Sequence, residues 1–475
     1  MPKTFYITTP IFYPNANLHL GHAYNTTLVD ILARYHRLKG DDVYLLTGAD
    51  ENTEKVVRAA SLAGMKTEAY LDGIVANFKS LFQKLNISYD QFIRTSDERV
   101  HFSGAQEMWR RLVEAGDIEK RSYEGLYCVG HEAFITEKDL VDGKCPDHEE
   151  TPQNLREENY FFKLSKYTKA VSEKIQSGEF RVIPETRKNE IVALLERGLE
   201  DVSFSRPSDK VSVGVPVPDD PSQTIYVWCD ALVNYLSALG FGREDNALFK
   251  KFWPASVHVI GKDILRFHAA IWPAMLLSAK LPLPKQLFVH GFITSGGKKM
   301  SKTIGNVIDP NELIAEYGGE AVRFFLARHI SPFEDGDITK ESFKEAYNAD
   351  LANGIGNLTS RIMKMASDNL AVPVHIPERS IPEDFLDAFD RYDVQEATTL
   401  ISKSMSAIDA RIQETAPFKL VKVDKVKGVA LIEEMVRELY AVARMLNPIL
   451  PETSEKIKSL IKKNRMPSEP LFPRK

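Results

Sequence analysis

The sequence predicts an α/β fold in which a parallel sheet is split by an inserted domain and followed by a bundle of helices. Three observations lead to this prediction. Within the first fifty residues a strand pattern, a helical pattern and a second strand pattern follow one another. The α/β pattern is interrupted after residue 117 by short strands and turns, and it resumes at "TIYVWCDALVNYL". After about residue 341 helical runs take over almost completely.

The first strand, helix and second strand set the framework of the sheet. "TFYITTPIFY" is rich in β-branched and aromatic residues and predicts a buried strand. From Leu20 to Leu38 apolar residues recur at helical spacing, and Gly40 is placed to end the helix. "DVYLLTGAD" predicts a second buried strand. Such a unit is right-handed with parallel strands, and ligands bind at the edge where the strands lead into the helices.

The later segments extend the sheet and then the bundle. "SVHVIGKDILRFHAAIWPAMLL" and "QLFVHGFITSGGKKMSK" continue the α/β pattern. "NADLANGIGNLTSRIMKMASDN", "VQEATTLISKSMSAIDARIQ" and "GVALIEEMVRELYAVARMLN" are helical, and the proline-containing stretch "AVPVHIPERSIPED" predicts a linker inside the helical part.

Composition excludes several classes of protein. The 475 residues are 43% hydrophobic with a formal net charge of −5, which is typical of a globular protein and argues against a generally basic nucleic-acid coat. No apolar run is long enough to cross a membrane, and the N-terminus leaves no room for a signal peptide. Three cysteines do not make a disulfide framework, so we expect a cytoplasmic protein.

Two histidines mark the start of the first helix. His19 and His22 are three residues apart, and a helix N-terminus with its free N–H groups attracts phosphate. Imidazoles there can donate hydrogen bonds to phosphate oxygens, and Gly21 lets a nucleotide lie against the backbone. The alternative is that both histidines only cap or pack the helix.

A lysine-rich loop follows a later strand. "SGGKKMSKTIGN" carries Lys298, Lys299 and Lys302 among glycines, where lysines can close over a triphosphate and stabilise charge that grows in the transition state. The alternative is a solvated basic turn. The chain contains neither a P-loop nor a GxGxxG motif after its first strand.

The two motifs together resemble those of class I aminoacyl-tRNA synthetases. "HLGH" is similar to their HIGH motif and "KMSKT" to their KMSKS loop, with Leu20 and Thr303 as mild departures. "TTPIFYPNANLHLGH", "TGADEN", "SRP", "IYVWCDALVNYL" and "VIGKDILRFHAAIWPA" extend the resemblance along nearly the whole chain to the methionyl-tRNA synthetase family, in a bacterial-type short form without a C-terminal dimerisation module.

The resemblance implies a Rossmann-like catalytic domain in two halves, an insert and an all-α anticodon-binding domain. The first half, with HLGH, would span residues 1–117, and the inserted connective domain with a zinc-knuckle-like element 118–222. The second half would span 223–290, the KMSKT loop and stem-contact region 291–344, and the helical anticodon-binding bundle 345–475.

The reaction implied has two steps and needs ATP with Mg²⁺. L-Methionine and ATP would form methionyl-adenylate and pyrophosphate, and the 3′ end of tRNA(Met) would then take the methionine. Positioning and charge stabilisation suffice for this chemistry. The catalytic groups would be His19, His22, Lys299 and Lys302. The ATP site would be lined by these four together with Gly21, Gly261, Asp263 and Ser301.

The resemblance also assigns a methionine pocket. A linear thioether favours aromatic walls, and a buried carboxylate would hold the substrate ammonium. Asp50 supplies that carboxylate, while Asn52 stands where the family commonly has His. The alternative for the aromatic members is core packing. The pocket residues would be Ile11, Tyr13, Asp50, Trp228, Ala231, Tyr235 and His268.

A structural zinc ion would sit in the insert. Cys128 and His131 form one closely spaced pair and Cys145 and His148 another, a spacing that suits tetrahedral zinc. The alternative is a decayed knuckle held by packing alone. Cys229, beside the pocket tryptophan, is interpreted as a core residue.

The helical third would read the tRNA anticodon. "NLTSR" matches the family's anticodon helix, so Asn357 and Arg361 would hydrogen-bond exposed bases. Phe418 of "APFKL" stands where the family usually has Trp, and it would stack on an unstacked base. We expect a monomer without membrane contact. Two alternatives stay open: an enzyme that adenylates a small acid without tRNA, and a non-catalytic RNA-binding paralogue.

Overall fold

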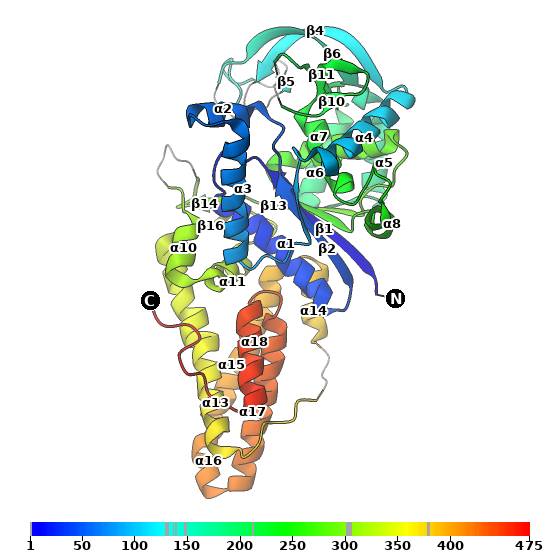
Figure 1. Cartoon of the computed structure of the whole chain (residues 1–475). Helices are drawn as coiled ribbons and strands as arrows, with labels where there is room; N and C mark the ends of the chain where they lie inside the picture. Colours follow the sequence, from blue (N-terminus) through cyan, green and yellow to red (C-terminus); the bar gives the residue numbers. More distant parts are fainter. Residues whose placement is uncertain are drawn as a thin grey trace.

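The computed structural model is elongated, with the sheet and the insert at one end and the helical bundle at the other (Figure 1). Among the described residues, no helix combines the length and the apolar character needed to cross a lipid bilayer. The structure describes residues 2–128, 133–135, 137, 140–146, 150–210, 213–300, 306–377 and 381–475.

The central sheet has six parallel strands in the described part of the chain, in the order β3-β2-β1-β12-β13-β7. The order runs outward from β1 on one side and from β12 on the other, so the strand order reverses between these two neighbours. Ligands bind outside the carboxyl ends of the strands at such a point. The strands are β1 (Thr4–Phe12), β2 (Asp42–Ala49), β3 (Gln91–Arg94), β7 (Arg181–Ile183), β12 (Val257–Gly261) and β13 (Gln286–His290).

The first strand, helix and second strand form as the sequence predicts. The helix α1 ends at Leu38, and Gly40 follows with φ +86°, a conformation that favours glycine. The helices around the sheet range from three residues in η4 to 19 residues in α1. They comprise α1 (Leu20–Leu38), α2 (Glu54–Leu62), α3 (Thr67–Lys84), the π-helix η1 (Glu98–Phe102), α4 (Ser103–Glu114), α7 (Val227–Ser237), α8 (Ala247–Phe252), the 3₁₀-helix η4 (Lys262–Ile264), the π-helix η5 (Phe267–Ile271) and α9 (Trp272–Ser278).

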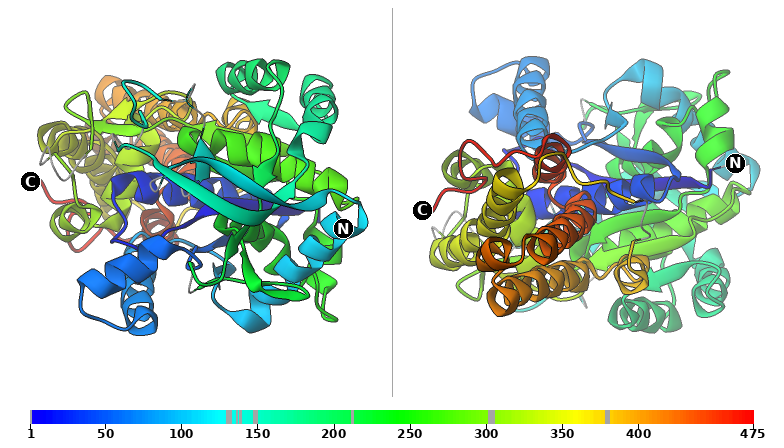
Figure 2. Two further views of the ribbon diagram at one scale, coloured as in Figure 1. Left: turned by 90° about the horizontal axis from the view of Figure 1, so that it is seen from above. Right: turned by 90° about the horizontal axis from the view of Figure 1, so that it is seen from below.

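The insert is built on a separate antiparallel sheet, β5-β4-β6-β8, whose long strands cross the top of the molecule (Figure 2, left). One strand of the predicted insert belongs to the central sheet instead of the antiparallel sheet. The strand β7 pairs with β13 at the edge of the central sheet, and it is too short for periodicity to reveal it. The elements are β4 (Ile118–Cys128), β5 (Ala133–Ile135), β6 (Gln153–Phe162), η3 (Leu164–Tyr167), α5 (Thr168–Gln176), α6 (Glu185–Glu196), β8 (Val202–Ser203), β9 (Ser205–Pro207), β10 (Pro216–Val217) and β11 (Asp220–Ile225).

The bundle follows a small three-stranded sheet, and the predicted linker separates α13 from α14. Figure 2 (right) shows the bundle helices in front of the central sheet. The elements are β14 (Ile293–Ser295), β15 (Lys298–Lys299), α10 (Pro310–Tyr317), α11 (Gly319–His329), β16 (Gly336–Asp337), α12 (Lys340–Ala346), the π-helix η6 (Tyr347–Gly356), α13 (Asn357–Asn369), α14 (Glu383–Asp390), α15 (Val394–Thr415), α16 (Pro417–Val423), α17 (Lys425–Leu446) and α18 (Pro451–Lys463).

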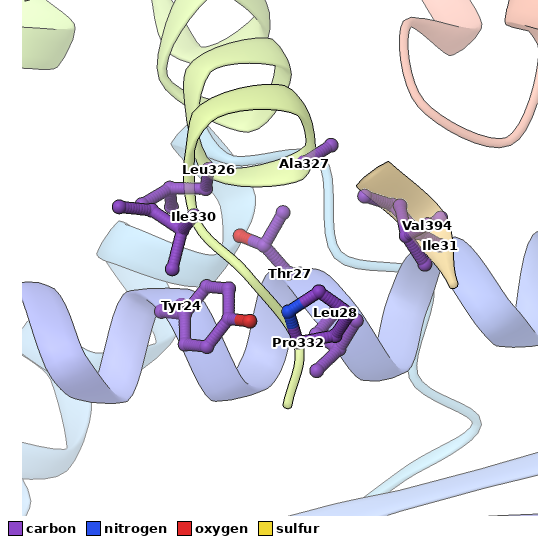
Figure 3. A pocket seen from close by; sticks show the side chains of 9 residues that line it. All are labelled: Tyr24, Thr27, Leu28, Ile31, Leu326, Ala327, Ile330, Pro332 and Val394. Carbon is purple, nitrogen blue, oxygen red and sulfur yellow. The ribbon is translucent and has the colours of Figure 1, made fainter. Parts of the chain in front are cut away.

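One apolar core runs without interruption from a face of the sheet into the bundle. The ring of Tyr35 on α1 stacks on Phe389 of α14 with centroids 4.4 Å apart. Where α1, α11 and α15 meet, side chains including Tyr24, Thr27 and Val394 leave a gap too small for water (Figure 3). Sheet and bundle are therefore packed as one body on this side.

A buried ion pair reinforces this junction. Arg323 of α11 lies 2.7 Å from Asp30 of α1, and both side chains are fully buried. Arg323 also donates to the carbonyl oxygens of Ile449 at 2.9 Å and Leu85 at 3.0 Å. Burial alone would raise the pKa of Asp30, but the charges of Arg323 and Arg34 together with two hydrogen bonds from Ser88 outweigh it, so the pKa is lowered. The carboxylate therefore stays ionised and joins the catalytic half to the bundle.

Candidate active site

The predicted site residues gather at the carboxyl edge of the central sheet. Ile11 lies at the end of β1, and Asp50 directly follows β2, where its N–H donates to the carbonyl of Phe12 at 2.9 Å. Gly261 ends the neighbouring strand β12. These strand ends lie at or next to the point where the strand order reverses, which is where such sheets bind nucleotides.

The two histidines form the N-terminal cap of α1. The N–H of Gly21 donates to His19 Nδ1 at 3.0 Å, and the N–H of His19 donates to His22 Nδ1 at 3.2 Å. Their rings lie 3.8 Å apart, and His22 also packs edge-on against Phe12. A Cβ at Gly21 would lie 2.8 Å from Cε1 of His19, so the glycine makes room for the imidazole itself.

The hydrogen bonds of this cap determine which ring nitrogen of each histidine carries the proton. Because each Nδ1 accepts a backbone hydrogen bond, the proton of a neutral ring must sit on Nε2, where it can be donated to a ligand. Burial, together with the electrostatic effect of His19, lowers the pKa of His22 to about 3. Desolvation also lowers the pKa of His19, although part of its surface is exposed to solvent. Near neutral pH both rings are therefore uncharged donors. Capping and phosphate binding, posed as alternatives by the sequence, are compatible.

The predicted methionine pocket begins with a buried carboxylate and an aromatic wall. Asp50 is 3% exposed at the end of β2. Trp228 at the start of α7 stacks on Phe267 of η5, with centroids 3.7 Å apart and an angle of 9°, and Tyr13 meets it edge-on. Phe267 was not predicted, although it stands beside His268 in "RFHAAIW", where an aromatic next to a predicted pocket residue is a usable signal.

The polar end of the pocket is a tyrosine–histidine pair. The Tyr235 hydroxyl and His268 Nε2 lie 2.8 Å apart, and His268 Nδ1 lies 3.0 Å from the carbonyl oxygen of Ile264. The carbonyl can only accept, so Nδ1 carries the proton and Nε2 accepts from the tyrosine. Burial lowers the pKa of His268 to about 4, which keeps the ring neutral. Ala231, one turn before Tyr235, is buried.

The predicted ATP-site residues are described only in part. Asp263 is exposed in the turn after Gly261. The lysine loop begins as the hairpin of β14 and β15, whose turn is held by the Asp337 carboxylate accepting from the N–H of Gly297 at 2.8 Å. The side chain of Lys299 and the whole of Ser301 and Lys302 lie outside the described residues.

The zinc prediction stays untested, because two of its four residues lie outside the described part of the chain. Cys128 and Cys145 are buried, with 2% and 1% exposure, whereas His131 and His148 lie outside the described residues. The described part of the chain contains no group of three or more candidate metal ligands. Cys229 is buried beside the pocket, in agreement with its interpretation as a core residue.

The predicted anticodon residues lie on the bundle, far along the chain from the sheet. Asn357 is exposed at the first position of α13, and Arg361, one turn later, forms an ion pair with Asp409 of α15. Phe418 on α16 is 46% exposed, which is unusual for a large aromatic side chain. An exposed aromatic ring provides a surface on which a base can stack.

Comparisons with known proteins agree with this architecture. A family model described as "tRNA synthetases class I (M)" matches residues 5–155 and 147–363. Methionine–tRNA ligase of Clostridium acetobutylicum is 43% identical over 473 residues, covering 96% of this chain and 73% of that protein. The corresponding protein of Thermosynechococcus vestitus is 41% identical, covering 96% of this chain and 90% of its own length.

Solved structures extend the similarity to three dimensions. Mycobacterium tuberculosis methionyl-tRNA synthetase in complex with methionyl-adenylate superimposes with a TM-score of 0.92 at 36% identity, covering 99% of this chain and 100% of that one. Its free form superimposes with a TM-score of 0.87 at 33% identity. With the family model, the full-length relatives and the fold in agreement, this chain belongs to the methionyl-tRNA synthetases of class I.

Proposed function

We propose that the chain is a methionine–tRNA ligase that activates L-methionine with ATP and transfers it to tRNA(Met). The observation that supports the proposal is the closeness of a buried carboxylate to a neutral hydrogen-bonded pair. Tyr235 and His268 form that pair, and burial together with the nearby charge of Asp50 raises the pKa of Tyr235. Trp228, on the same helix as Tyr235, stacks on Phe267. The capped end of α1 lies at the same edge of the sheet as Asp50.

In the first step the methionine carboxylate attacks the α-phosphorus of ATP, and pyrophosphate leaves. Asp50 holds the ammonium, and Ile11, Tyr13, Ala231 and the Trp228 wall enclose the thioether. The pair of Tyr235 and His268 presents polar atoms near the sulfur. The enzyme forms no covalent bond to the substrate, so its contribution is orientation and electrostatic stabilisation.

ATP enters as its Mg²⁺ complex. The Nε2–H groups of His19 and His22 donate to its phosphate oxygens, beside the free N–H groups of the helix end. Because the rings are neutral, they stabilise a pentacoordinate phosphorus by hydrogen bonding without a charge of their own. Lys299 and Lys302 supply positive charge to the leaving pyrophosphate. Gly21, Gly261, Asp263 and Ser301 line the nucleotide.

In the second step the terminal ribose hydroxyl of tRNA attacks the carbonyl carbon of the adenylate, and AMP leaves. The bundle contributes by binding the anticodon through Asn357, Arg361 and Phe418. A zinc ion held by Cys128, His131, Cys145 and His148 would stabilise the insert, and neither step is routed through it. That the chain works as a monomer in the cytoplasm stays a prediction from the sequence.

Two assays test the proposal. In ATP–pyrophosphate exchange without tRNA, we expect exchange with methionine and none with leucine, isoleucine or valine. In aminoacylation, we expect charging of tRNA(Met) and none of the same tRNA with an altered anticodon. Exchange without charging would favour an enzyme that adenylates a small acid. Absence of both, with retained RNA binding, would favour a non-catalytic paralogue.

A further inference from the structure

A series of buried side-chain hydrogen bonds lies next to the predicted methionine pocket, and none of its residues takes part in the reaction described above. Asp230 stands between Trp228 and Ala231 in the first turn of α7, and its side chain is fully buried. One carboxylate oxygen accepts from Asn52 Nδ2 at 2.7 Å, and the other lies 2.5 Å from His101 Nε2. Both oxygens of a buried carboxylate are thereby satisfied, as such a group requires.

The series of hydrogen bonds extends beyond Asn52 at one end and beyond His101 at the other. Asn52 Nδ2 also donates to the carbonyl of Thr95 at 3.0 Å, and His101 Nδ1 lies 2.7 Å from the hydroxyl of Ser237 at the last position of α7. Asn52, His101 and Ser237 are 5%, 0% and 0% exposed. Gly104 of α4 permits this approach, because a Cβ there would lie 2.7 Å from Cβ of Ser237.

These contacts connect the two ends of the amino-acid site. Asn52 is two residues after Asp50, which holds the ammonium, whereas Asp230 lies between two residues of the side-chain wall. The bond from Asn52 to Asp230 therefore fixes the spacing between the ammonium end and the thioether end of the pocket. His101 holds the second oxygen of Asp230 and prevents that carboxylate from turning away.

We propose that Asn52, His101 and Asp230, backed by Ser237, are positioning residues that set the geometry of the amino-acid pocket without touching the substrate. The proposal rests on the function proposed above and names the determinants of substrate fit at that site. A misplaced pocket weakens methionine binding selectively, because the ATP contacts at α1 and β12 belong to other elements.

Two serines provide a matched test. Ser237→Ala removes the hydroxyl that holds His101, and Ser278→Ala removes an equally buried hydroxyl that donates to Asp117 at 2.7 Å, ten residues beyond His268. Asn52→Ala is the more drastic variant, because it removes the side chain that donates to Asp230. All three proteins and the wild type are compared by ATP–pyrophosphate exchange and by thermal unfolding.

We expect Asn52→Ala to raise the KM for methionine about tenfold and Ser237→Ala to raise it about threefold, with the KM for ATP changed less than about twofold. Ser278→Ala should lower the Tm and leave both KM values unchanged. An unchanged methionine KM in Asn52→Ala and Ser237→Ala, or equal changes in both KM values and kcat, would overturn the proposal. If the wild type itself shows no methionine-dependent exchange, the proposed function fails instead.

Discussion

The two ends of the molecule present their predicted binding residues in opposite ways. At the sheet, Asp50, Tyr235 and His268 are at most 3% exposed and are held among other side chains. On the bundle, Asn357 is exposed and Phe418 is 46% exposed. A small amino acid needs a pocket formed in advance, because it offers few contacts with which to organise one, whereas an RNA loop brings its own bases to exposed side chains.

The largest effect is expected at the junction that joins these two ends. Arg323→Met should lower the free energy of unfolding by about 3–5 kcal/mol, because it leaves Asp30 buried without its main cationic partner. Urea unfolding followed by circular dichroism measures the change. Arg110→Met removes an exposed helical pair, in which Arg110 lies 3.9 Å from Glu107, and should have almost no effect. Equal stability of the two variants would show that the junction is not held by this ion pair.

The second largest effect is expected at the carboxylate that we assign to the methionine ammonium. Asp50→Asn should raise the KM for methionine at least about 100-fold, since a partly dry ammonium–carboxylate contact is worth about 3 kcal/mol. Steady-state exchange at saturating ATP measures it. Asn357→Ala should leave exchange untouched and impair only charging of tRNA. A normal methionine KM in Asp50→Asn would remove this residue from the site.

The buried histidine also makes the pocket sensitive to acid. His268 has a folded pKa of about 4 against 6.5 in the unfolded chain, so below pH 6.5 the unfolded state binds the proton first. The contribution of the neutral ring to the free energy of unfolding is therefore complete above pH 6.5 and is lost as the pH falls towards 4. At pH 5 the loss is about 2 kcal/mol. Unfolding of the wild type and His268→Gln at pH 7 and pH 5 should show a smaller loss in the variant. Identical losses would mean that this histidine is not desolvated.

The smallest effect belongs to the exposed end. Phe418→Ala should raise the KM for tRNA about five- to tenfold, the lower part of what a stacked base contributes, and leave exchange unchanged. Phe418→Trp should lower that KM, because the indole offers a larger stacking surface and an N–H donor. Aminoacylation over a range of tRNA concentrations measures both variants. If Phe418→Ala charges tRNA normally, the anticodon does not stack here.

The sequence predicted those parts of the fold and site whose signals are local. The spacing from Leu20 to Gly40 predicted α1 and its end, because a helix repeats every 3.6 residues. The motif at His19 and His22 pointed to a helix end because a strand precedes it. The resemblance named Ile11 and Asp50, which lie at the carboxyl ends of β1 and β2, whereas its other pocket residues stay predictions.

The residues that escaped prediction act through contacts between distant segments. His101 and Asp230 are 129 residues apart in sequence, and Asn52 and Asp230 are 178 apart. No periodicity links such positions. Likewise β7 has only three residues, and its position is determined by pairing with β13, about a hundred residues later in the sequence. Phe267 lacks a motif of its own, and its role is visible only in the stack on Trp228.

The most direct test of a preformed pocket is binding without tRNA. A non-hydrolysable methionyl-adenylate analogue is titrated into the free protein in a calorimeter, with Asp50→Asn as the comparison. The account predicts saturable binding of one analogue per chain in the absence of tRNA, and binding at least tenfold weaker in the variant. Binding that appears only after tRNA is added would contradict it.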